Sequence, residues 1–492
     1  MRYLLALLAF WAIWMEYPKV AFQDPSGIHF IRQTDGLAFA TYYFETGNPF
    51  LESGTLNQSS LEGRVACELP VFYFLTAKIY STTGIYFPIL RWLHGLVVLF
   101  GIFHVFLFLK QWSKSVLMSL TMMLMLLTSV VFAYYAFNFL PDAPAWSLVW
   151  MGWYYAFQLT QKWNLKWLMA SIFLFLLGAL LKPTFFIHAV AAMGMWFWGR
   201  KELNWESKKW IQIAGIFTGA LALIVGWSMH IIQYNAFNHD DYFLVSTRPI
   251  WKMDSEDIGV VWDHMTGYWF RDYLARDSWR ILLGMLVLIA LRWKSLNQHL
   301  RNALWILTLG ELAYVVLFFG QFKDHDYYIW NIFPWLILVM AAFVNAFWEA
   351  LAQRVLKQLV GIVMLILVMN SWISNEKVIR WRFGHDEPNL AWVGKRLQHG
   401  SEWLKESGVL PFTEQVVVVP DFTRNGSLLF IQQEGWTLAD STQLGRLNSE
   451  ELSSATKLMI LDSAYLKFPE VEEHWVLQRA DTAQEIYLLK RR

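Results

Sequence analysis

Long apolar blocks separated by short polar loops dominate the pattern of this chain. Eleven of these blocks approach or reach the roughly 20 residues that an α-helix needs to cross the hydrocarbon core of a bilayer. The pattern therefore predicts a polytopic α-helical membrane protein with about eleven transmembrane helices. The first block is expected to remain as an uncleaved span, because no small-x-small cleavage site follows it. The predicted spans cover residues 3–22, 88–109, 115–135, 144–159, 167–181, 185–198, 211–231, 281–291, 303–320, 329–347 and 356–372.

Charge in the loops alternates along the chain and predicts the topology. Basic residues mark the loops that stay in the cytoplasm, and here they recur in every second loop, on the side of Arg2. The opposite side then receives the loop 23–87, the turns 138–143, 182–184 and 321–328, the loop 233–280 and the tail. The basic residues are Lys110, Lys114, Lys162, Lys166, Arg200, Lys201, Lys208, Lys209, Arg292, Lys294, Arg301, Arg354 and Lys357.

The texture of the sequence changes to that of a soluble protein near residue 379. Residues 416–420 and 457–462 read as buried strands, and residues 424–433 between them suit a helix. The sequence therefore predicts two domains. Residues 1–378 form the membrane domain, including the outer loop 23–87, and residues 379–492 form a small extracytoplasmic α/β domain.

The loop 23–87 carries two acids beside apolar stretches. Asp35 precedes Gly36, and Glu68 lies two residues before Pro70. A carboxylate at a membrane boundary is costly unless it is solvated or paired, so these acids are candidate site residues; solvated loop acids are the alternative. Residues 36–46 and 69–80 suit amphipathic helices on the outer interface, the first with Phe39, Tyr42 and Tyr43 facing lipid. A loosely ordered loop is the competing picture.

Composition adds two exclusions. The 492 residues are 56% hydrophobic and 16% charged, and the net charge of +1 gives no sign of nucleic-acid binding. The single cysteine, Cys67, rules out an intramolecular disulfide framework in the outer loops.

The outer turns gather carboxylates, cations and phenols, which suit binding of an anionic lipid headgroup and deprotonation of an alcohol or amine. Asp142 lies in a turn closed by two prolines, and Asp35 suits the role of a general base. A departing phosphate needs cations or hydrogen-bond donors. As plain alternatives, Lys182 snorkels and the tyrosines belong to an interfacial belt. The candidate phosphate-binding residues are Lys182, Arg248, Arg271, Lys323, His325, Tyr327 and Tyr328.

Metal binding has two candidate sites. His325 is flanked by Asp324 and Asp326, and His239 is followed by two acids, but neither group has the spacing of a structural zinc site. Exposed acidic loops explain both, so no metal or other cofactor is expected, with a divalent ion as the alternative. Glu311 interrupts an apolar span and must pair, line a cavity or be protonated. We interpret Glu311 as structural, with a proton or lipid role as the alternative.

The order of these motifs resembles the GT-C glycosyltransferases that depend on polyprenyl phosphate. This superfamily includes the dolichyl-phosphate-mannose protein mannosyltransferases and the bacterial lipid A aminoarabinose transferase. The resemblance rests on the order and common sidedness of the motifs, from Arg2 to Tyr328, and on the architecture of the whole chain. Its motifs are Asp35-Gly36, Glu68 before Pro70, Pro141-Asp142-Ala143-Pro144, Lys182-Pro183-Thr184 and His325-Asp326-Tyr327-Tyr328.

The resemblance implies an inverting transfer of a sugar from a polyprenyl-phosphate donor to a lipid, glycan or protein acceptor at the outer membrane face. It implies that the catalytic residues are Asp35, Glu68 and Asp142: Asp35 as the base, Glu68 as the acid that positions substrate, and Asp142 as the acid of the Pro-Asp turn. Some relatives carry a phosphate-binding lysine where this chain has Leu69, so other groups must bind the phosphate. This difference weakens the interpretation that lipid A is the acceptor. We expect a bacterial inner membrane protein with a cytoplasmic N-terminus and a periplasmic tail.

A secondary transporter or lipid flippase is the alternative function. Such a protein also has many spans, but it places its coupling residues near the midplane, often at broken helices. Only Glu311 lies at that level in the sequence, whereas the other candidate groups gather on one face. This distribution favours the enzyme. The absence of a nucleotide-binding glycine-rich loop agrees with a donor sugar that was activated elsewhere.

Overall fold

A computed structural model describes residues 2–243, 247–348, 354–384 and 391–492. By its contacts, the chain divides into two compact units, each described below by itself. The predicted domain boundary near residue 378 stays a prediction. The first unit comprises Met1–Lys19, His94–Ser228 and Val245–Ile379, and the second comprises Val20–Leu93, Met229–Leu244 and Arg380–Arg492.

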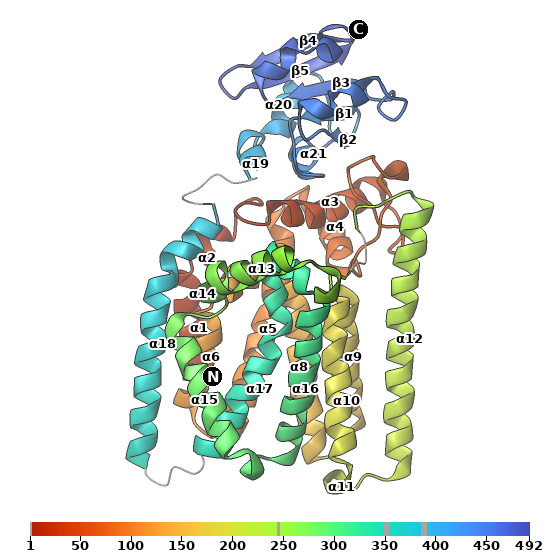
Figure 1. Ribbon diagram of the computed structural model, residues 1–492. Coiled ribbons are helices and arrows are strands. Elements are labelled where there is room, and N and C mark those ends of the chain that lie inside the picture. The colour runs from red at the N-terminus through yellow and green to blue at the C-terminus, as the bar shows by residue number, and fades with distance from the viewer. Residues whose placement is uncertain (1, 244–246, 349–353, 385–390) are drawn as a thin grey trace. The chain divides into compact units, whose positions relative to one another are not determined.

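The first unit is a bundle of helices (Figure 1). Three long helices contribute residues to both units: α5 (Pro88–Ser113), α12 (Ser207–Phe237) and α18 (Arg354–Arg382). The short α2 (Tyr17–Val20) also crosses the division. The other helices of the first unit are α1 (Arg2–Trp14), α6 (Val116–Leu127), α7 (Val130–Ala136), α8 (Asp142–Gln161), α9 (Leu165–Leu181), α10 (Phe186–Trp198), α11 (Arg200–Leu203), α13 (Ser255–Asp263), α14 (Phe270–Tyr273), α15 (Arg276–Leu291), α16 (Gln298–Leu317) and α17 (Phe333–Phe343).

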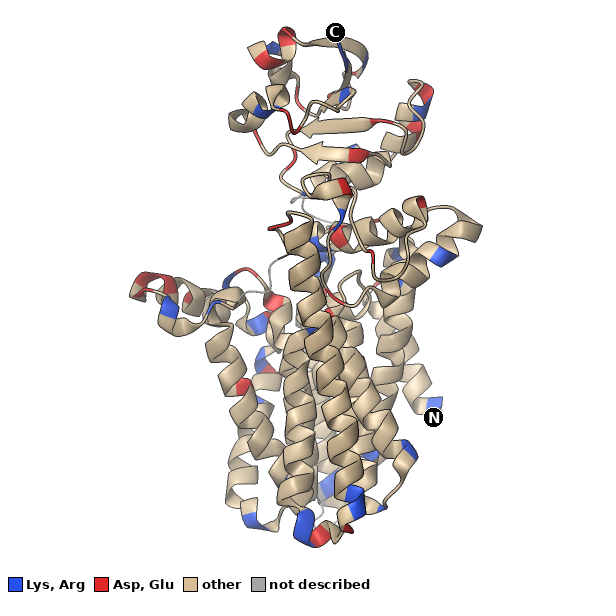
Figure 2. Ribbon diagram, turned by 90° about the vertical axis from the view of Figure 1, so that its right-hand side faces the viewer, with Lys and Arg blue, Asp and Glu red and all other residues tan. Residues whose placement is uncertain are grey.

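Each predicted span coincides with a helix or with a run of adjoining helices. By length and composition, four helices of the described chain are long and apolar enough to cross a membrane: α5, α12, α16 and the run Asp326–Phe347. Two bent pairs raise the number to six if each pair is one span. Figure 2 shows that the helices carry little charge along their middle lengths, and that Lys and Arg gather at the end of the bundle where α11 lies.

Aromatic side chains hold α8 inside the first unit. Trp146, Trp150 and Trp153 are completely buried, and their spacing of four and three residues places them on one face of the helix. Gly152 lets α9 approach closely, because a Cβ atom there would meet the Phe175 ring at 3.0 Å. The large tryptophan side chains on one face of α8 and the missing side chain at Gly152 thus fix how this helix packs.

The second unit contains the two helices predicted in the loop 23–87, as α3 (Phe30–Thr46) and α4 (Val71–Thr83). The predicted orientation of α3 is wrong. Phe39, Tyr42 and Tyr43 are at most 3% exposed, and the Phe39 ring stacks on Tyr73 of α4 with ring centres 5.4 Å apart. Phe39 and Tyr43 pack against α4, and Tyr42 packs against Gly54. Packing against protein removes as much apolar surface from water as packing against lipid.

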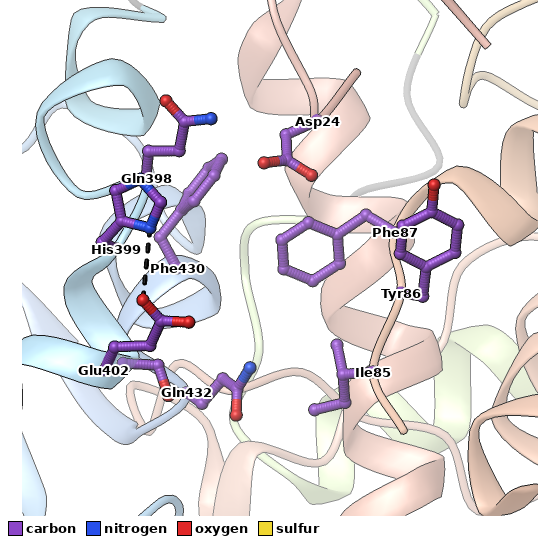
Figure 3. Close-up of a pocket in the computed structure, with 10 residues that line it drawn as sticks. Asp24, Ile85, Tyr86, Phe87, Gln398, His399, Glu402, Phe430 and Gln432 are labelled. Atoms are coloured by element: carbon purple, nitrogen blue, oxygen red, sulfur yellow. Dashed lines mark ion pairs between the residues drawn. The ribbon is translucent and has the colours of Figure 1, made fainter. Parts of the chain in front are cut away.

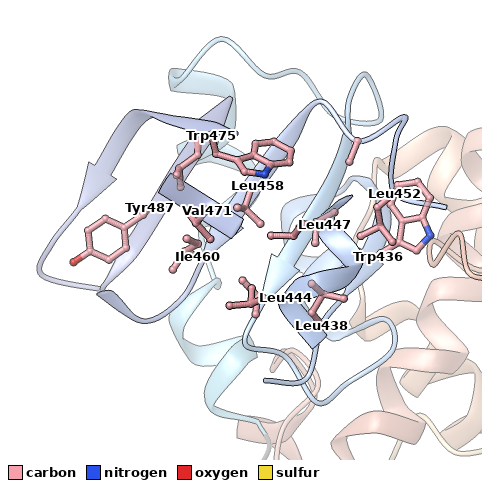
Figure 4. Packing of buried hydrophobic residues seen from close by; sticks show 14 residues of the cluster. Trp436, Leu438, Leu444, Leu447, Leu452, Leu458, Ile460, Val471, Trp475 and Tyr487 are labelled. Atoms are coloured by element: carbon pink, nitrogen blue, oxygen red, sulfur yellow. The ribbon is translucent and has the colours of Figure 1, made fainter. Parts of the chain in front are cut away.

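The tail carries the predicted α/β fold, with strands and a helix over the three segments that the sequence indicated. A five-stranded sheet has the order β2-β1-β3-β5-β4, with parallel pairing of β1 to β2 and β3 and antiparallel pairing of β5 to β3 and β4. One face of the sheet buries the apolar cluster drawn in Figure 4. The elements are α19 (Trp392–Arg396), α20 (Gly400–Glu406), β1 (Gln415–Val419), α21 (Gly426–Ile431), β2 (Glu434–Thr437), β3 (Lys457–Ile460), α22 (Pro469–Glu472), β4 (Trp475–Asp481) and β5 (Ile486–Arg491).

The edge strand β2 is covered by the loop that precedes α4. The Gly435 N–H donates to the Leu56 carbonyl at 3.1 Å, and the Gln58 N–H donates to the Gly435 carbonyl at 2.7 Å. Gly435 has a φ of 152°, and a Cβ atom there would lie 1.9 Å from the Val416 carbonyl oxygen, so only glycine fits. This pairing protects the exposed edge and ties loop 23–87 to the sheet within one unit.

Candidate functional site

Asp35 lies in the second turn of α3 and is 2% exposed. Burial raises the pKa of this carboxyl to about 6, although the nearby Arg32 charge and a hydrogen bond from Asn425 lower it. Gly36, the next residue, allows close packing, since a Cβ atom there would meet the Tyr73 ring at 3.2 Å. The group that the sequence nominated as a base is therefore enclosed, and its pKa lies nearer to neutral than that of an ordinary aspartate.

Two neutral donors fix the Asp35 carboxylate. The side-chain N–H of Asn425 donates to Oδ1 at 2.8 Å, and the Tyr242 hydroxyl donates to Oδ2 at 3.3 Å. Arg424 lies with its guanidinium 4.5 Å from the centre of the Tyr242 ring and pairs with Asp240 at 2.6 Å. Both carboxylate oxygens are thus oriented from loops that are distant in sequence from α3.

Glu68 occupies a different electrostatic environment from Asp35. It accepts hydrogen bonds from Arg32 Nη2 at 2.5 Å and from the Tyr73 hydroxyl. Burial acts to raise the pKa of Glu68, but the Arg32 charge and hydrogen bonds from Cys67, Tyr73 and Arg32 outweigh it and lower the pKa to about 2. Glu68 is therefore a permanently ionised partner of Arg32, whereas Asp35 titrates near neutral pH.

We expect the Arg32 to Met substitution to destabilise the fold by about 3 kcal/mol, because it leaves the Glu68 charge buried and unpaired. The double substitution Arg32→Met/Glu68→Gln should recover most of that loss. Thermal unfolding of the purified variants in detergent measures both effects. If the double variant unfolds no later than the single one, the ion pair does not hold this part of the fold.

A second set of candidate residues lies in the first unit around Asp142. This residue starts α8, where a carboxylate favours the helix N-terminus, and the flanking prolines fall where the helix lacks internal N–H partners. Asp142 Oδ1 lies 2.7 Å from Lys182 Nζ, at the end of α9. Lys182 is therefore not a snorkelling cation, since its charge is directed inward to a buried acid.

Two phenol rings complete the surroundings of Lys182. The lysine Nζ lies 4.9 Å from the centre of the Tyr327 ring and 4.5 Å from that of Tyr328, both on the 3-10 helix Asp326–Asn331. His325 stacks on Tyr328 with ring centres 5.7 Å apart. The structure thus brings together four of the predicted phosphate-binding residues: Lys182, His325, Tyr327 and Tyr328.

The other three predicted cations are exposed on neighbouring segments of the same unit. The Lys323 carbonyl accepts a hydrogen bond from Trp269 Nε1 at 3.1 Å, two residues before Arg271. The Gly320 N–H donates to the Arg248 carbonyl at 3.0 Å. Arg248, Arg271 and Lys323 therefore lie around one short 3-10 helix, Phe319–Lys323.

One acid of each candidate metal site has another partner. Asp326 accepts a hydrogen bond from the Tyr135 hydroxyl at 2.6 Å, and Asp240 pairs with Arg424. Over the described residues, no group of three or more His, Cys, Asp or Glu side chains is arranged to hold a metal ion. That the protein needs no metal ion stays a prediction, with a bound divalent ion as the alternative.

Glu311 is buried in α16, next to His188 and Asn331. The Asn331 side-chain N–H donates to Glu311 Oε2 at 3.5 Å, and His188 Nε2 lies 3.7 Å from Glu311 Oε1. Trp153 Nε1 donates to His188 Nδ1 at 3.3 Å, so Nε2 carries the proton and donates to the Asn331 carbonyl at 3.0 Å. This cluster anchors the end of the segment that carries Tyr327 and Tyr328, which agrees with a structural role for Glu311.

Sequence reasoning missed Arg32, Tyr242, Arg424 and Asn425. Asn425 begins a match to the N-glycosylation pattern, but its side chain is fully buried and directed to Asp35. Asn57, which begins a second match to this pattern at Asn57-Gln58-Ser59, is 2% exposed and donates to the Arg424 carbonyl at 2.8 Å. Both asparagine side chains are thus buried hydrogen-bond donors. Their role depends on tertiary contacts that the sequence pattern does not show.

The sequence matches no protein-family model and no curated protein. Its fold is nevertheless found among solved structures. ArnT from Cupriavidus metallidurans in the apo state aligns over 99% of this chain and 97% of its own, at a TM-score of 0.63 and 11% identity. The same protein bound to undecaprenyl phosphate aligns over the same shares, at a TM-score of 0.63 and 10% identity.

The arabinofuranosyltransferase AftD from Mycobacteria is a second structural neighbour. It aligns over 100% of this chain and 40% of its own, at a TM-score of 0.55 and 12% identity. The likeness to ArnT and AftD shows that this chain has the GT-C fold that the order of its motifs predicted. With its apolar helices, this fold makes it a multi-pass membrane protein.

Proposed function

We propose that this protein is an inverting glycosyltransferase that moves a hexose or pentose from a polyprenyl-phosphate donor to a lipid, glycan or protein acceptor. The GT-C fold supports the proposal, because ArnT with this fold binds undecaprenyl phosphate and AftD is an arabinofuranosyltransferase. The observation that carries the proposal is the Asp35 carboxylate, buried and fixed by Asn425 and Tyr242.

Asp35 is assigned the role of general base. With a pKa of about 6, its carboxylate is largely ionised at neutral pH and binds a proton more readily than an exposed aspartate does. In the reaction, Asp35 takes the proton of an acceptor hydroxyl or amine. The acceptor atom forms a bond to the anomeric carbon while the bond from that carbon to the phosphate oxygen breaks, which inverts the configuration.

Lys182, His325, Tyr327 and Tyr328 are assigned to the phosphate of the donor. A cation and phenol hydroxyls stabilise the negative charge that grows on the leaving phosphate. Lys182 already pairs with Asp142. A phosphate bound at this lysine would therefore share the positive charge of Lys182 with the Asp142 carboxylate. Arg248, Arg271 and Lys323 are assigned to attracting the anionic headgroup, since they are exposed on nearby segments.

Glu68 and Asp142 are assigned positioning roles. Each holds one cation in place, Glu68 through Arg32 and Asp142 through Lys182. Among the described residues, Arg32 Nη1 is buried and has no hydrogen-bond partner, which leaves one donor for a substrate oxygen. Both acids thus act through their cations.

We place the protein in a bacterial inner membrane, with the N-terminus in the cytoplasm and the tail in the periplasm.

The pH dependence of transfer should reveal the base. A general base works only when it is deprotonated, so kcat/KM should rise with pH through about 6 and level off above 7. We expect the value at pH 5 to be about tenfold lower than at pH 7. Initial rates at low acceptor concentration from pH 5 to 8 measure this limb. A flat profile over that range would argue against Asp35 as the base.

The proposed function itself is tested by transfer from radiolabelled polyprenyl-phosphate sugars to membrane extracts. The purified wild-type protein should form a labelled product whose solubility and enzymatic digestion give the acceptor class. Absence of transfer with hexose and pentose donors alike would overturn the proposal. Transport assays with Glu311→Gln would then test the transporter alternative.

A further inference from the structure

A cavity of about 170 Å³ lies in the second unit, between the segment leading into α5, the start of α20 and the end of α21 (Figure 3). Asp24, Gln398 and Gln432 line it with polar groups, and Phe87 and Phe430 line it with aromatic rings. The two rings are 5.6 Å apart in an edge arrangement. An apolar wall with a few convergent polar groups is the usual composition of a small-molecule site.

The polar groups of this cavity are available to a ligand. Within the described part of the chain, the side chains of Asp24, Gln398 and Gln432 make no hydrogen bond or ion pair with protein groups. Two amides and a carboxylate offer both donors and acceptors, which matches hydroxyl groups that donate and accept at once. At the rim, Glu402 is 80% exposed and pairs with His399 at 3.3 Å.

The chemistry of the cavity selects against an anion. Among the described residues, the lining holds the carboxylates of Asp24 and Glu402 and no lysine or arginine. Burial raises the pKa of Asp24, and the charges of Arg91 and His399 oppose that rise, but Arg91 is not part of the lining. The guanidinium of Arg91 is buried and donates to the Gln23 carbonyl at 2.6 Å, and His399 pairs with Glu402. A phosphate would meet two carboxylates there, and like charges repel. The donor phosphate therefore does not suit this cavity, whereas an uncharged polyhydroxylated ring does.

The two ends of α21 connect the cavity to Asp35. Asn425, which donates to Asp35, immediately precedes α21, while Phe430 and Gln432 at the other end of that helix line the cavity. Phe30 of α3 also stacks on Phe430, with ring centres 6.3 Å apart. Seven residues of helical rise separate Asn425 from Gln432, or about 10 Å. A ligand in the cavity is thus held at a defined distance from the Asn425 end of α21.

We infer that this cavity binds a neutral sugar ring of the acceptor, remote from the hydroxyl that Asp35 deprotonates. The inference rests on the proposed function and names its acceptor as a saccharide. The cavity is smaller than the roughly 300–1,000 Å³ of pockets for drug-sized ligands, which suits a single ring. Binding here contributes to acceptor affinity and orientation, and not to the chemical step.

Saccharide binding without donor tests the site. Full-length protein in detergent is mixed with common neutral mono- and disaccharides and with their uronic-acid counterparts, and binding is measured by saturation-transfer NMR. Gln432→Gly is the sharpest variant, because Gln432 has a φ of 51° that glycine adopts without strain. Asp24→Asn tests the carboxylate. Gln484→Ala in the exposed β4–β5 turn is the matched control.

We expect a neutral saccharide to bind at least tenfold more weakly to Gln432→Gly and to Asp24→Asn than to the wild type or to Gln484→Ala. In transfer, Gln432→Gly should raise KM for the acceptor with kcat retained, whereas Asp35→Asn should lower kcat and leave saccharide binding intact. The inference is overturned if no neutral saccharide binds at millimolar concentration, if the cavity variants bind normally, or if the uronic acids bind more tightly. Saccharide binding without any transfer would overturn the proposed function alone.

Discussion

Replacing Asp35 by Asn should lower sugar transfer by a factor of about 10² to 10⁴, the usual contribution of a general base. The amide has the shape of the carboxylate and can still accept the hydrogen bond from Asn425, but it cannot take a proton. Initial rates of transfer at saturating donor and acceptor measure the loss. A residual rate within tenfold of the wild-type rate would remove Asp35 from the role of base.

The same substitution should not weaken the fold. The pKa of Asp35 is about 6 in the folded protein against 3.8 for the unperturbed group, so the folded state binds more protons than the unfolded state between about pH 4 and 6. Stability from this group is therefore present at acid pH and is lost as pH rises through that window, a cost of roughly 3 kcal/mol at pH 7. The neutral amide avoids that cost.

A matched control separates catalysis from folding. Asp481→Asn makes the same change at the last residue of β4, where the carboxylate accepts hydrogen bonds from the backbone N–H groups of Ala483 and Gln484. At pH 7 we expect Asp35→Asn to unfold at the wild-type temperature or above it, and Asp481→Asn to transfer sugar at the wild-type rate. Retained binding of the polyprenyl-phosphate donor by Asp35→Asn would place its defect in the chemical step.

The sequence predicted the helices better than it predicted their faces. Long apolar blocks give helices wherever they occur, because the backbone must satisfy its own hydrogen bonds in an apolar surrounding. The sequence does not show whether the apolar face that carries Phe39 contacts lipid or protein, because lipid and a protein core accept the same apolar side chains. The aromatic stripe of α3 therefore predicted the helix correctly and its environment wrongly.

The candidate site was predictable in its acids and unpredictable in their partners. Motif order nominated Asp35 and Glu68 together, but their sequence contexts do not show that one is paired with Arg32 and the other with Asn425. Asn425 follows Asp35 by 390 residues and belongs to the tail, so no local pattern links the two. What distinguishes the proposed base from Glu68 is tertiary: Asp35 accepts hydrogen bonds from neutral donors, whereas Glu68 accepts one from a guanidinium.

Replacing Asn425 by Asp should therefore disable the proposed base, Asp35, without removing it. The new carboxylate would lie within hydrogen-bond distance of Asp35, and two carboxylates in one site share a proton, which strongly raises the pKa of one of them. We expect transfer at pH 7 to fall about 10- to 100-fold, with recovery as pH rises toward 9. Initial rates from pH 6 to 9 measure it. A loss that is equal at every pH would indicate a structural role for Asn425.

Two further variants distinguish charge from position. Asn425→Ala removes a hydrogen bond to the ionised carboxylate, a loss of about 1.5 to 3 kcal/mol that should move the rising limb of the pH profile upward by about one to two units. The exchange variant Asp35→Asn/Asn425→Asp keeps one carboxylate and one amide in the same contact. A base must lie within hydrogen-bond reach of the proton that it removes, so this exchange should stay as inactive as Asp35→Asn. Activity in the exchange variant would mean that only the charge matters, and that the α3 backbone does not define the place of the base.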